Sequence, residues 1–134
     1  MSAADKLRVL IVDDDATAVM TTSALLEDEG HTVTSRTEVF GTLAVAVREQ
    51  PDVILIDIGM PGLRGDHLAR LMFSEQRLQG TSLVLYSSLP EAQLSKMAKE
   101  CGATGYLVKS ANGQDFLRAF RALLANRPAR PSAR

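Results

Sequence analysis

The segment RVLIVDDD, residues 8–15, decides the fold, because an uninterrupted apolar run ends there in consecutive carboxylates. A second run of this kind, VILID at residues 53–57, ends in Asp57. Short runs that are apolar at every position are typical of strands buried on both faces, as in a parallel sheet covered by helices. Both segments are therefore predicted to be strands that carry acidic side chains at their carboxyl ends.

Five apolar runs alternate with stretches of helical spacing, which predicts an α/β fold with a doubly wound, five-stranded parallel sheet and five helices. The expected strands are Arg8 to Asp13, Thr32 to Ser35, Val53 to Asp57, Leu83 to Ser87 and Gly105 to Lys109. The second strand is polar, so we expect it at an edge of the sheet. Two helical stripes are expected to face the core, namely Leu94, Met97, Ala98 and Cys101, and Phe116, Leu117, Phe120, Leu123 and Leu124.

The composition fits one domain, since 46% of the 134 residues are apolar and 23% are charged. We expect this domain to span residues 1–125, followed by a disordered tail at 126–134 that contains proline and arginine and nothing apolar larger than alanine. No apolar run approaches the roughly 20 residues of a membrane span, and the first residues do not resemble a secretory signal. With the lone Cys101 excluding an internal disulfide, the sequence predicts a cytoplasmic protein without membrane contact.

Charge and histidine content indicate little further chemistry. The net charge is −1, and the stretch from Asp115 onward is modestly basic. This stretch owes its positive charge to arginines, which are explained by a solubilising tail. Direct binding of nucleic acid is therefore not expected. His31 and His67 show no ligand spacing and are expected on the surface or on a helix face.

Polar side chains gather where the predicted strands end, which is where ligands of doubly wound parallel sheets bind. They are Asp13, Asp14 and Asp15 after the first strand, Asp57 in the third, Ser87 and Ser88 after the fourth and Lys109 in the fifth. Adjacent carboxylates repel phosphate and favour a cation, and oxygen ligands favour Mg²⁺. The ammonium of Lys109 and a hydroxyl such as that of Ser87 are instead suited to binding a phosphoryl group. Capping of the next helix is the plainer interpretation, but it needs only one aspartate and leaves Asp57 unexplained.

These residues resemble the receiver domain of two-component response regulators, and the resemblance covers residues 7–125. It is carried by Asp13-Asp14 after a strand, Asp57 ending the third strand, MPGLRG at 60–65, Ser87 ending the fourth, and Tyr106 with Lys109 in the fifth. The resemblance implies a flavodoxin-like fold with strand order 2-1-3-4-5. The sequence is similar in particular to single-domain receivers of the chemotaxis type.

The resemblance also implies the chemistry of the site. Asp57 is the expected phosphoacceptor, with Lys109 and Ser87 binding the phosphoryl group, and Ser87 and Tyr106 are the expected switch residues. The implied Mg²⁺ ligands are Asp13 through water, Asp14, Asp57 and the Gly59 carbonyl. Such a protein is not a classical enzyme, although it catalyses its own Mg²⁺-dependent phosphorylation and dephosphorylation.

The implied partners are a sensor histidine kinase or histidine phosphotransfer protein, and a downstream protein target. One alternative is a pseudo-receiver that binds partners without phosphorylation. Another is a phosphatase of the haloacid-dehalogenase type, because DDDAT at 13–17 fits the D-x-D-x-T pattern of that family. The phosphatase interpretation leaves Asp57 and MPGLRG unexplained.

Overall fold

The computed structural model describes residues 6–59, 65–109 and 112–125, with no side chains between residues 65 and 69. Most of MPGLRG and the tail expected at 126–134 lie outside these ranges. The elements in chain order are β1 (Arg8–Val12), α1 (Ala16–Asp28), β2 (Thr32–Arg36), α2 (Thr42–Glu49), β3 (Val53–Asp57), α3 (Gly65–Ser74), the 3₁₀ helix η1 (Gln76–Leu78), β4 (Ser82–Ser87), α4 (Glu91–Cys101), β5 (Gly105–Val108) and α5 (Gly113–Ala125). None of the described helices combines the length and the apolar character that a membrane span requires.

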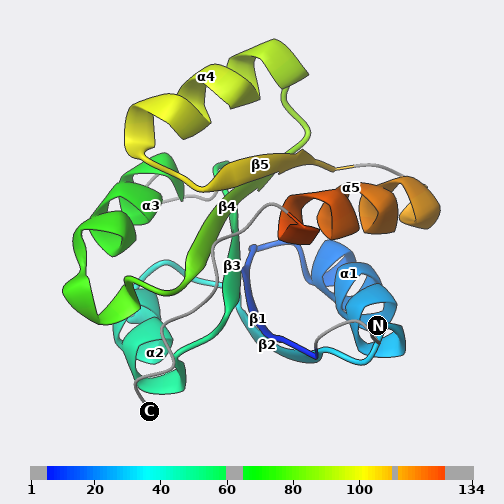
Figure 1. Ribbon diagram of the computed structural model, residues 1–134, viewed down its shortest axis with the longest axis horizontal. Helices are drawn as coiled ribbons and strands as arrows, with labels where there is room; N and C mark the ends of the chain where they lie inside the picture. The colour runs from blue at the N-terminus through cyan, green and yellow to red at the C-terminus, as the bar shows by residue number, and fades with distance from the viewer. Residues whose placement is uncertain (1–5, 60–64, 110–111, 126–134) are drawn as a thin grey trace.

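The strands form one parallel sheet in the order β2-β1-β3-β4-β5. Helices α1 and α5 cover one face, and α2, α3 and α4 cover the other (Figure 1). This confirms the predicted fold class and strand order, and it places the polar β2 at an edge. The central strand β3 is buried at all of its positions because helices cover both of its faces.

Alternate residues of each strand belong to different cores. Val9 and Ile11 of β1 and Leu55 of β3 pack with Phe116 and Phe120 of α5. Their neighbours along the strands pack on the other face against α2, α3 and α4. Because side chains alternate with a period of two, residues 13, 57 and 109 continue the row that faces α1 and α5.

Two strands end one residue earlier than expected, at Val12 and Val108, so that Asp13 and Lys109 lie just beyond them. Their backbone N–H groups still donate to neighbouring strands, from Asp13 to Arg36 O at 3.0 Å and from Lys109 to Ser87 O at 2.7 Å. Strands β2 and β4 are each one residue longer than expected, at the carboxyl end of β2 and the amino end of β4. Asp13 and Lys109 therefore stand just beyond the ends of their strands, whereas Asp57 and Ser87 are the last residues of β3 and β4.

His31 is buried between the end of α1 and the start of β2, so the expectation that it lies on the surface or on a helix face is wrong. It is 7% exposed, its Nδ1 accepts the N–H of Leu7 at 3.1 Å, and its ring meets Phe120 edge-on with 5.7 Å between centroids. Burial lowers the pKa of His31, against an opposing effect of Glu29. His31, which lies between α1 and β2, thus accepts a hydrogen bond next to the start of β1 and packs against the middle of α5.

We expect the folded protein to lose stability as the pH falls below 6.5, the ordinary pKa of histidine. A lowered folded-state pKa means that the unfolded chain binds the proton first, so the stabilisation is complete above 6.5 and is lost below it. Urea unfolding at neutral and mildly acidic pH measures this loss. His31→Asn keeps an acceptor for Leu7 without titrating, so its stability should depend less on pH. Equal pH dependence in both proteins would contradict the assignment.

Candidate functional site

Asp13, Asp14 and Asp57 come together at the carboxyl ends of β1 and β3. One oxygen from each carboxylate lies within 4.8 Å of the others. Asp13 is fully buried, Asp57 is 9% exposed, and Asp14 is open to solvent. The remaining aspartate of the run, Asp15, is the N-cap of α1 and accepts the N–H groups of Thr17 and Ala18. Helix capping therefore explains Asp15 alone.

Lys109 supplies the positive charge of this acidic cluster. Its Nζ lies 2.8 Å from Asp13 Oδ2 and 3.5 Å from Asp57 Oδ2, and its side chain is 22% exposed. The lysine follows β5 at the far edge of the sheet, so its stem reaches across the end of β4 to the carboxylates. The structure thus brings together the acidic and the basic residues that the sequence singled out.

The electrostatics of the cluster leave negative charge in excess. Burial raises the pKa of Asp57, and the N–H of Gly59 and the ammonium of Lys109 oppose this rise only in part. Burial by itself lowers the pKa of Lys109, but the attraction of Asp13 and Asp57 outweighs it and raises that pKa. Among the described residues, one ammonium therefore faces three carboxylates, two of which are poorly hydrated.

The oxygen atoms of the cluster fit a divalent cation. Asp13 Oδ1 accepts the N–H of Asp15, and Asp57 Oδ1 accepts the N–H of Gly59, both at 3.0 Å. Asp13 Oδ2 is buried and accepts no well-directed hydrogen bond from the described residues, although Lys109 lies beside it. Buried carboxylate oxygens with spare coordination and excess negative charge are suited to a hard metal ion.

Ser87 and Tyr106 are placed on the other side of the sheet rim. The Ser87 hydroxyl is buried at the end of β4 and accepts the N–H of Leu89 at 3.1 Å. Tyr106 is half-buried, and its hydroxyl donates to Glu91 Oε2, at the start of α4, at 3.0 Å. Ser87 therefore contacts the short segment that joins β4 to α4, and Tyr106 contacts the first residue of α4.

Sequence reasoning missed Tyr86 and Thr22. The Tyr86 hydroxyl and the Thr22 hydroxyl lie 2.9 Å apart, and Lys109 Nζ sits over the Tyr86 ring at 5.2 Å from its centroid. Strand periodicity could have found Tyr86, because it has the same parity as Val84 and therefore faces α1 and α5. The contact with Lys109 depends on strand register, which the sequence pattern does not specify.

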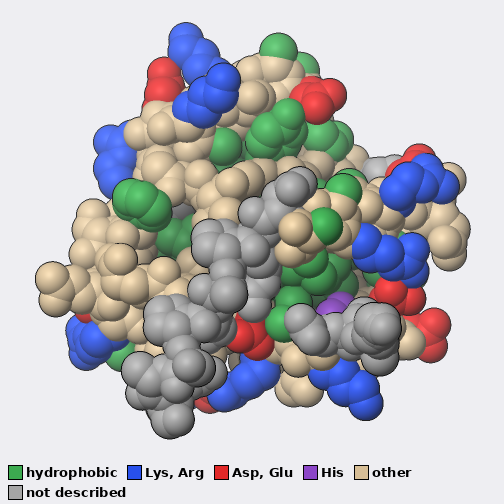
Figure 2. Space-filling model, in the orientation of Figure 1, with side chains coloured by type: hydrophobic (Ala, Val, Ile, Leu, Met, Phe, Trp, Pro, Cys, Tyr) green, Lys and Arg blue, Asp and Glu red, His purple; other side chains and the backbone are tan. Residues whose placement is uncertain are grey.

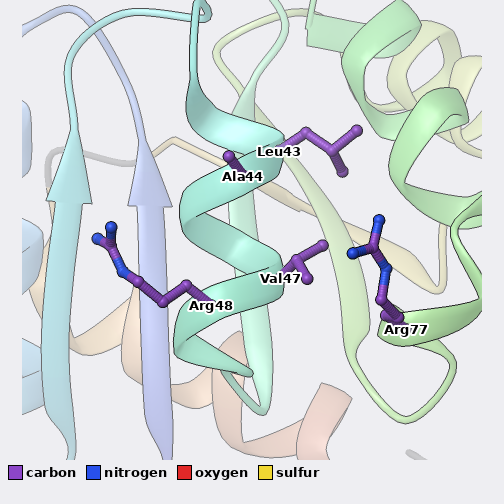
Figure 3. A pocket seen from close by; sticks show the side chains of 5 residues that line it. All are labelled: Leu43, Ala44, Val47, Arg48 and Arg77. Atoms are coloured by element: carbon purple, nitrogen blue, oxygen red, sulfur yellow. The ribbon is translucent and has the colours of Figure 1, made fainter.

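Two hollows lie away from the acidic cluster. One, of about 500 Å³, lies between α2 and η1; in Figure 3, Leu43 and Val47 point toward Arg77 while Arg48 turns away. None of the described residues that line it is acidic or nucleophilic, and Arg77 is held by Glu75 at 2.9 Å, so we assign this hollow no chemistry. The other, of about 410 Å³, contains Tyr106 and lies where hydrophobic side chains gather between α4 and α5 (Figure 2).

Comparison with known proteins assigns the family. The family model of the response regulator receiver domain matches residues 9–121. The chain belongs to the response regulator receiver domain family. Protein PilH of Pseudomonas aeruginosa is 32% identical over 118 residues, which are 88% of this chain and 98% of PilH. Protein PilG of the same organism is 28% identical, over 88% of this chain and 87% of PilG.

Solved receiver structures share the architecture. The chemotaxis response regulator CheY4 of Vibrio cholerae superposes with a TM-score of 0.81 at 26% identity, covering 89% of this chain and 99% of CheY4. This receiver domain therefore has a phosphoacceptor role in two-component signalling, with histidine kinases or phosphotransfer proteins as partners. The match favours neither a pseudo-receiver nor a dehalogenase-type phosphatase.

Proposed function

We propose that Asp57 is the residue that accepts the phosphoryl group, in a reaction that depends on Mg²⁺. The observation that carries this assignment is that Asp57 lies beside both the other two carboxylates and Lys109, with part of its side chain open to solvent. Its Oδ1 is oriented by the N–H of Gly59, and its Oδ2 lies 3.5 Å from the ammonium. Asp13 also lies beside Lys109 but is fully buried, and Asp14 is exposed, so Asp57 is the carboxylate that combines an opening to solvent with metal-binding neighbours and a cation for the incoming charge.

The proposed step transfers one phosphoryl group and balances without a further reactant. An oxygen of the Asp57 carboxylate forms a bond to phosphorus, while the bond from phosphorus to the donor imidazole nitrogen breaks and its electron pair leaves with the imidazole. Lys109 neutralises the transferred oxygens, and Ser87 donates a hydrogen bond to one of them. When bound, Mg²⁺ would supply further positive charge here, and its ligands would be Asp14, Asp57, the Gly59 carbonyl and, through water, Asp13.

The donor that we infer is the phosphohistidine of a sensor kinase or of a phosphotransfer protein. The product acyl phosphate adds negative charge at the sheet rim and changes the surface that a downstream protein recognises. We place this reaction in the cytoplasm, where a buried thiol such as that of Cys101 stays reduced.

Intact mass after incubation with acetyl phosphate tests the proposed function. With Mg²⁺ the mass should rise by one phosphoryl group, and EDTA should prevent the rise. Asp14→Ala removes a proposed metal ligand at an exposed position, so we expect this variant to fold and to need far more Mg²⁺. Uptake that is undiminished in EDTA, or no uptake by the wild type, would count against the proposal.

Ser87 and Tyr106 provide a route from the site to the surface. The Ser87 hydroxyl is bonded to the N–H of Leu89, and Tyr106 is bonded to Glu91, two residues further along. If Ser87 turns toward a phosphoryl oxygen, it releases Leu89, and the contact between Glu91 and Tyr106 is free to rearrange. The hollow beside Tyr106 and Glu91 gives the changed side chains a place at the surface.

Ser87→Ala should therefore separate phosphorylation from signalling. We expect the variant to accept the phosphoryl group but to lose most of the phosphorylation-induced NMR shifts across residues 90–109 and 112–118. Ser88→Ala, at the exposed neighbouring serine, is the matched control and should behave as the wild type. Shifts of wild-type size in Ser87→Ala would show that its hydroxyl does not couple the two regions.

A further inference from the structure

Strand register places an aromatic ring directly beneath the charged cluster. Asp57 of β3 pairs with Tyr86 of β4, and Tyr86 pairs with Leu107 of β5. Tyr86 packs with the core that faces α1 and α5, as Leu107 does, and Lys109 follows Leu107 on that side. The Tyr86 side chain therefore lies between the strand that carries Asp57 and the one that leads to Lys109.

The ring is held firmly in this place. Tyr86 is 5% exposed, its hydroxyl shares a buried hydrogen bond of 2.9 Å with Thr22 of α1, and its ring packs against Phe116 of α5 at 5.7 Å between centroids. Burial raises the pKa of the phenol, so the ring remains uncharged. The hydroxyl is engaged at α1, while the ring presents a face to Lys109 Nζ at 5.2 Å.

We propose that Tyr86 is a positioning residue for phosphoryl transfer, because its ring face holds the Lys109 ammonium at the carboxylate cluster. This inference rests on the proposed function of Asp57. An ammonium within 6 Å of a ring centroid is attracted by the negative face of the ring. Lysine has a long flexible stem, so this attraction restricts the positions that its charge visits.

The contact with a ring face suits a charge that must move. The ion pair with Asp13, at 2.8 Å, depends closely on the position of Nζ. The attraction to the ring changes little when Nζ shifts sideways, since the ring face is broad compared with a single oxygen. Lys109 can therefore turn from Asp13 toward the phosphoryl group on Asp57 without leaving the ring.

The experiment compares aromatic and aliphatic side chains at position 86. Tyr86→Phe keeps the ring and loses the bond to Thr22, Thr22→Val loses the same bond from the other side, and Tyr86→Leu removes the ring. We expect Tyr86→Phe and Thr22→Val to take up phosphate from acetyl phosphate at close to the wild-type rate, at saturating Mg²⁺. We expect Tyr86→Leu to be about tenfold slower, the size of a partly buried cation–π contact.

NMR reports the contact independently of the reaction. The ε-methylene protons of Lys109 should be shifted upfield by the ring in the wild type and in Tyr86→Phe, and should return to ordinary values in Tyr86→Leu. Phe120→Leu is the matched control, because it removes a ring from the same core, and the ring contacts of Phe120 are with His31 and Phe116 rather than with Tyr86. It should lower stability without changing either the Lys109 shift or the rate.

Fluorinated phenylalanines at position 86 keep the inference testable if Tyr86→Leu does not fold. Successive fluorines weaken the negative face while the ring keeps its shape, so the rate should fall with each addition. A rate that is independent of fluorination, or a wild-type rate in folded Tyr86→Leu, would overturn the inference alone. A wild type that takes up no phosphoryl group would overturn the proposed function and the positioning role with it, even with the Lys109 shift present.

Discussion

Asp57→Asn should abolish phosphoryl uptake and at the same time raise the melting temperature of the metal-free protein. The amide is not a nucleophile for phosphorus, and we propose no second acceptor in the cluster. The same change removes a poorly hydrated charge beside Asp13, which we expect to stabilise the fold by about 1 kcal/mol, or about 4 °C. Intact mass after acetyl phosphate treatment and thermal unfolding in EDTA measure the two effects.

The pH dependence of the stability gained by Asp57→Asn follows from the raised pKa of Asp57. The folded protein binds a proton at a higher pH than the unfolded chain, so the associated stability is present at low pH and is lost as the pH rises through the folded-state pKa. Asparagine at position 57 does not ionise, so the variant keeps that stability as the pH rises. The advantage of Asp57→Asn should therefore be largest at neutral pH and should disappear below 3.8, the ordinary pKa of the group.

Asp15→Asn is the matched control, because asparagine caps a helix about as well as aspartate and Asp15 stands outside the cluster. It should phosphorylate like the wild type and should show none of this pH-dependent gain. Uptake by Asp57→Asn equal to that of the wild type would identify a different acceptor. An unchanged melting temperature would show that the carboxylates are not coupled.

Lys109→Met should destabilise the protein strongly and slow phosphoryl uptake by about a hundredfold or more. Asp13 is fully buried, and without the ammonium its charge has lost the partner at 2.8 Å. Breaking a buried ion pair costs about 3 kcal/mol, and we expect somewhat less here because Lys109 is partly exposed. Thermal unfolding in EDTA and the rate of uptake from acetyl phosphate measure the two losses.

Two further measurements on Lys109→Met, one with added Mg²⁺ and one with a second substitution, show whether the uncompensated charge of Asp13 causes the instability. Mg²⁺ should recover much of the lost melting temperature, because a cation that binds only the folded state replaces the missing positive charge. Asp13→Asn combined with Lys109→Met should be more stable than Lys109→Met alone, since the unpaired carboxylate is gone. If the two substitutions are simply additive, the ion pair contributes nothing to the fold.

The sequence by itself predicted the architecture because the relevant signals are local. VILID at 53–57 is apolar on both faces of a strand, which requires helices on both sides. Gly102 ends α4 in the left-handed region at φ 84°, as expected of glycine after a helix. The acidic cluster was also predictable, since parallel strands present their carboxyl ends at one rim.

Other features depended on contacts between residues far apart in the chain. The aspartates at 13, 14 and 15 look alike in sequence, yet they are respectively buried beside Lys109, exposed to solvent and engaged as a helix cap. Their separate roles follow from where the chain turns out of β1 into α1. The burial of His31 similarly depends on α5 closing over the start of β1.

The position of Tyr86 shows most clearly what cannot be predicted from the sequence. A strand period of two tells which residues share a face, so the sequence contains the information that Tyr86 faces α1 and α5. It does not contain the alignment of Asp57 with Tyr86 and of Tyr86 with Leu107. That register is set by packing of whole strands and helices, because a shift along a strand moves every side chain against its neighbours at once. Only the tertiary structure therefore decided that an aromatic ring lies beneath the ammonium of Lys109.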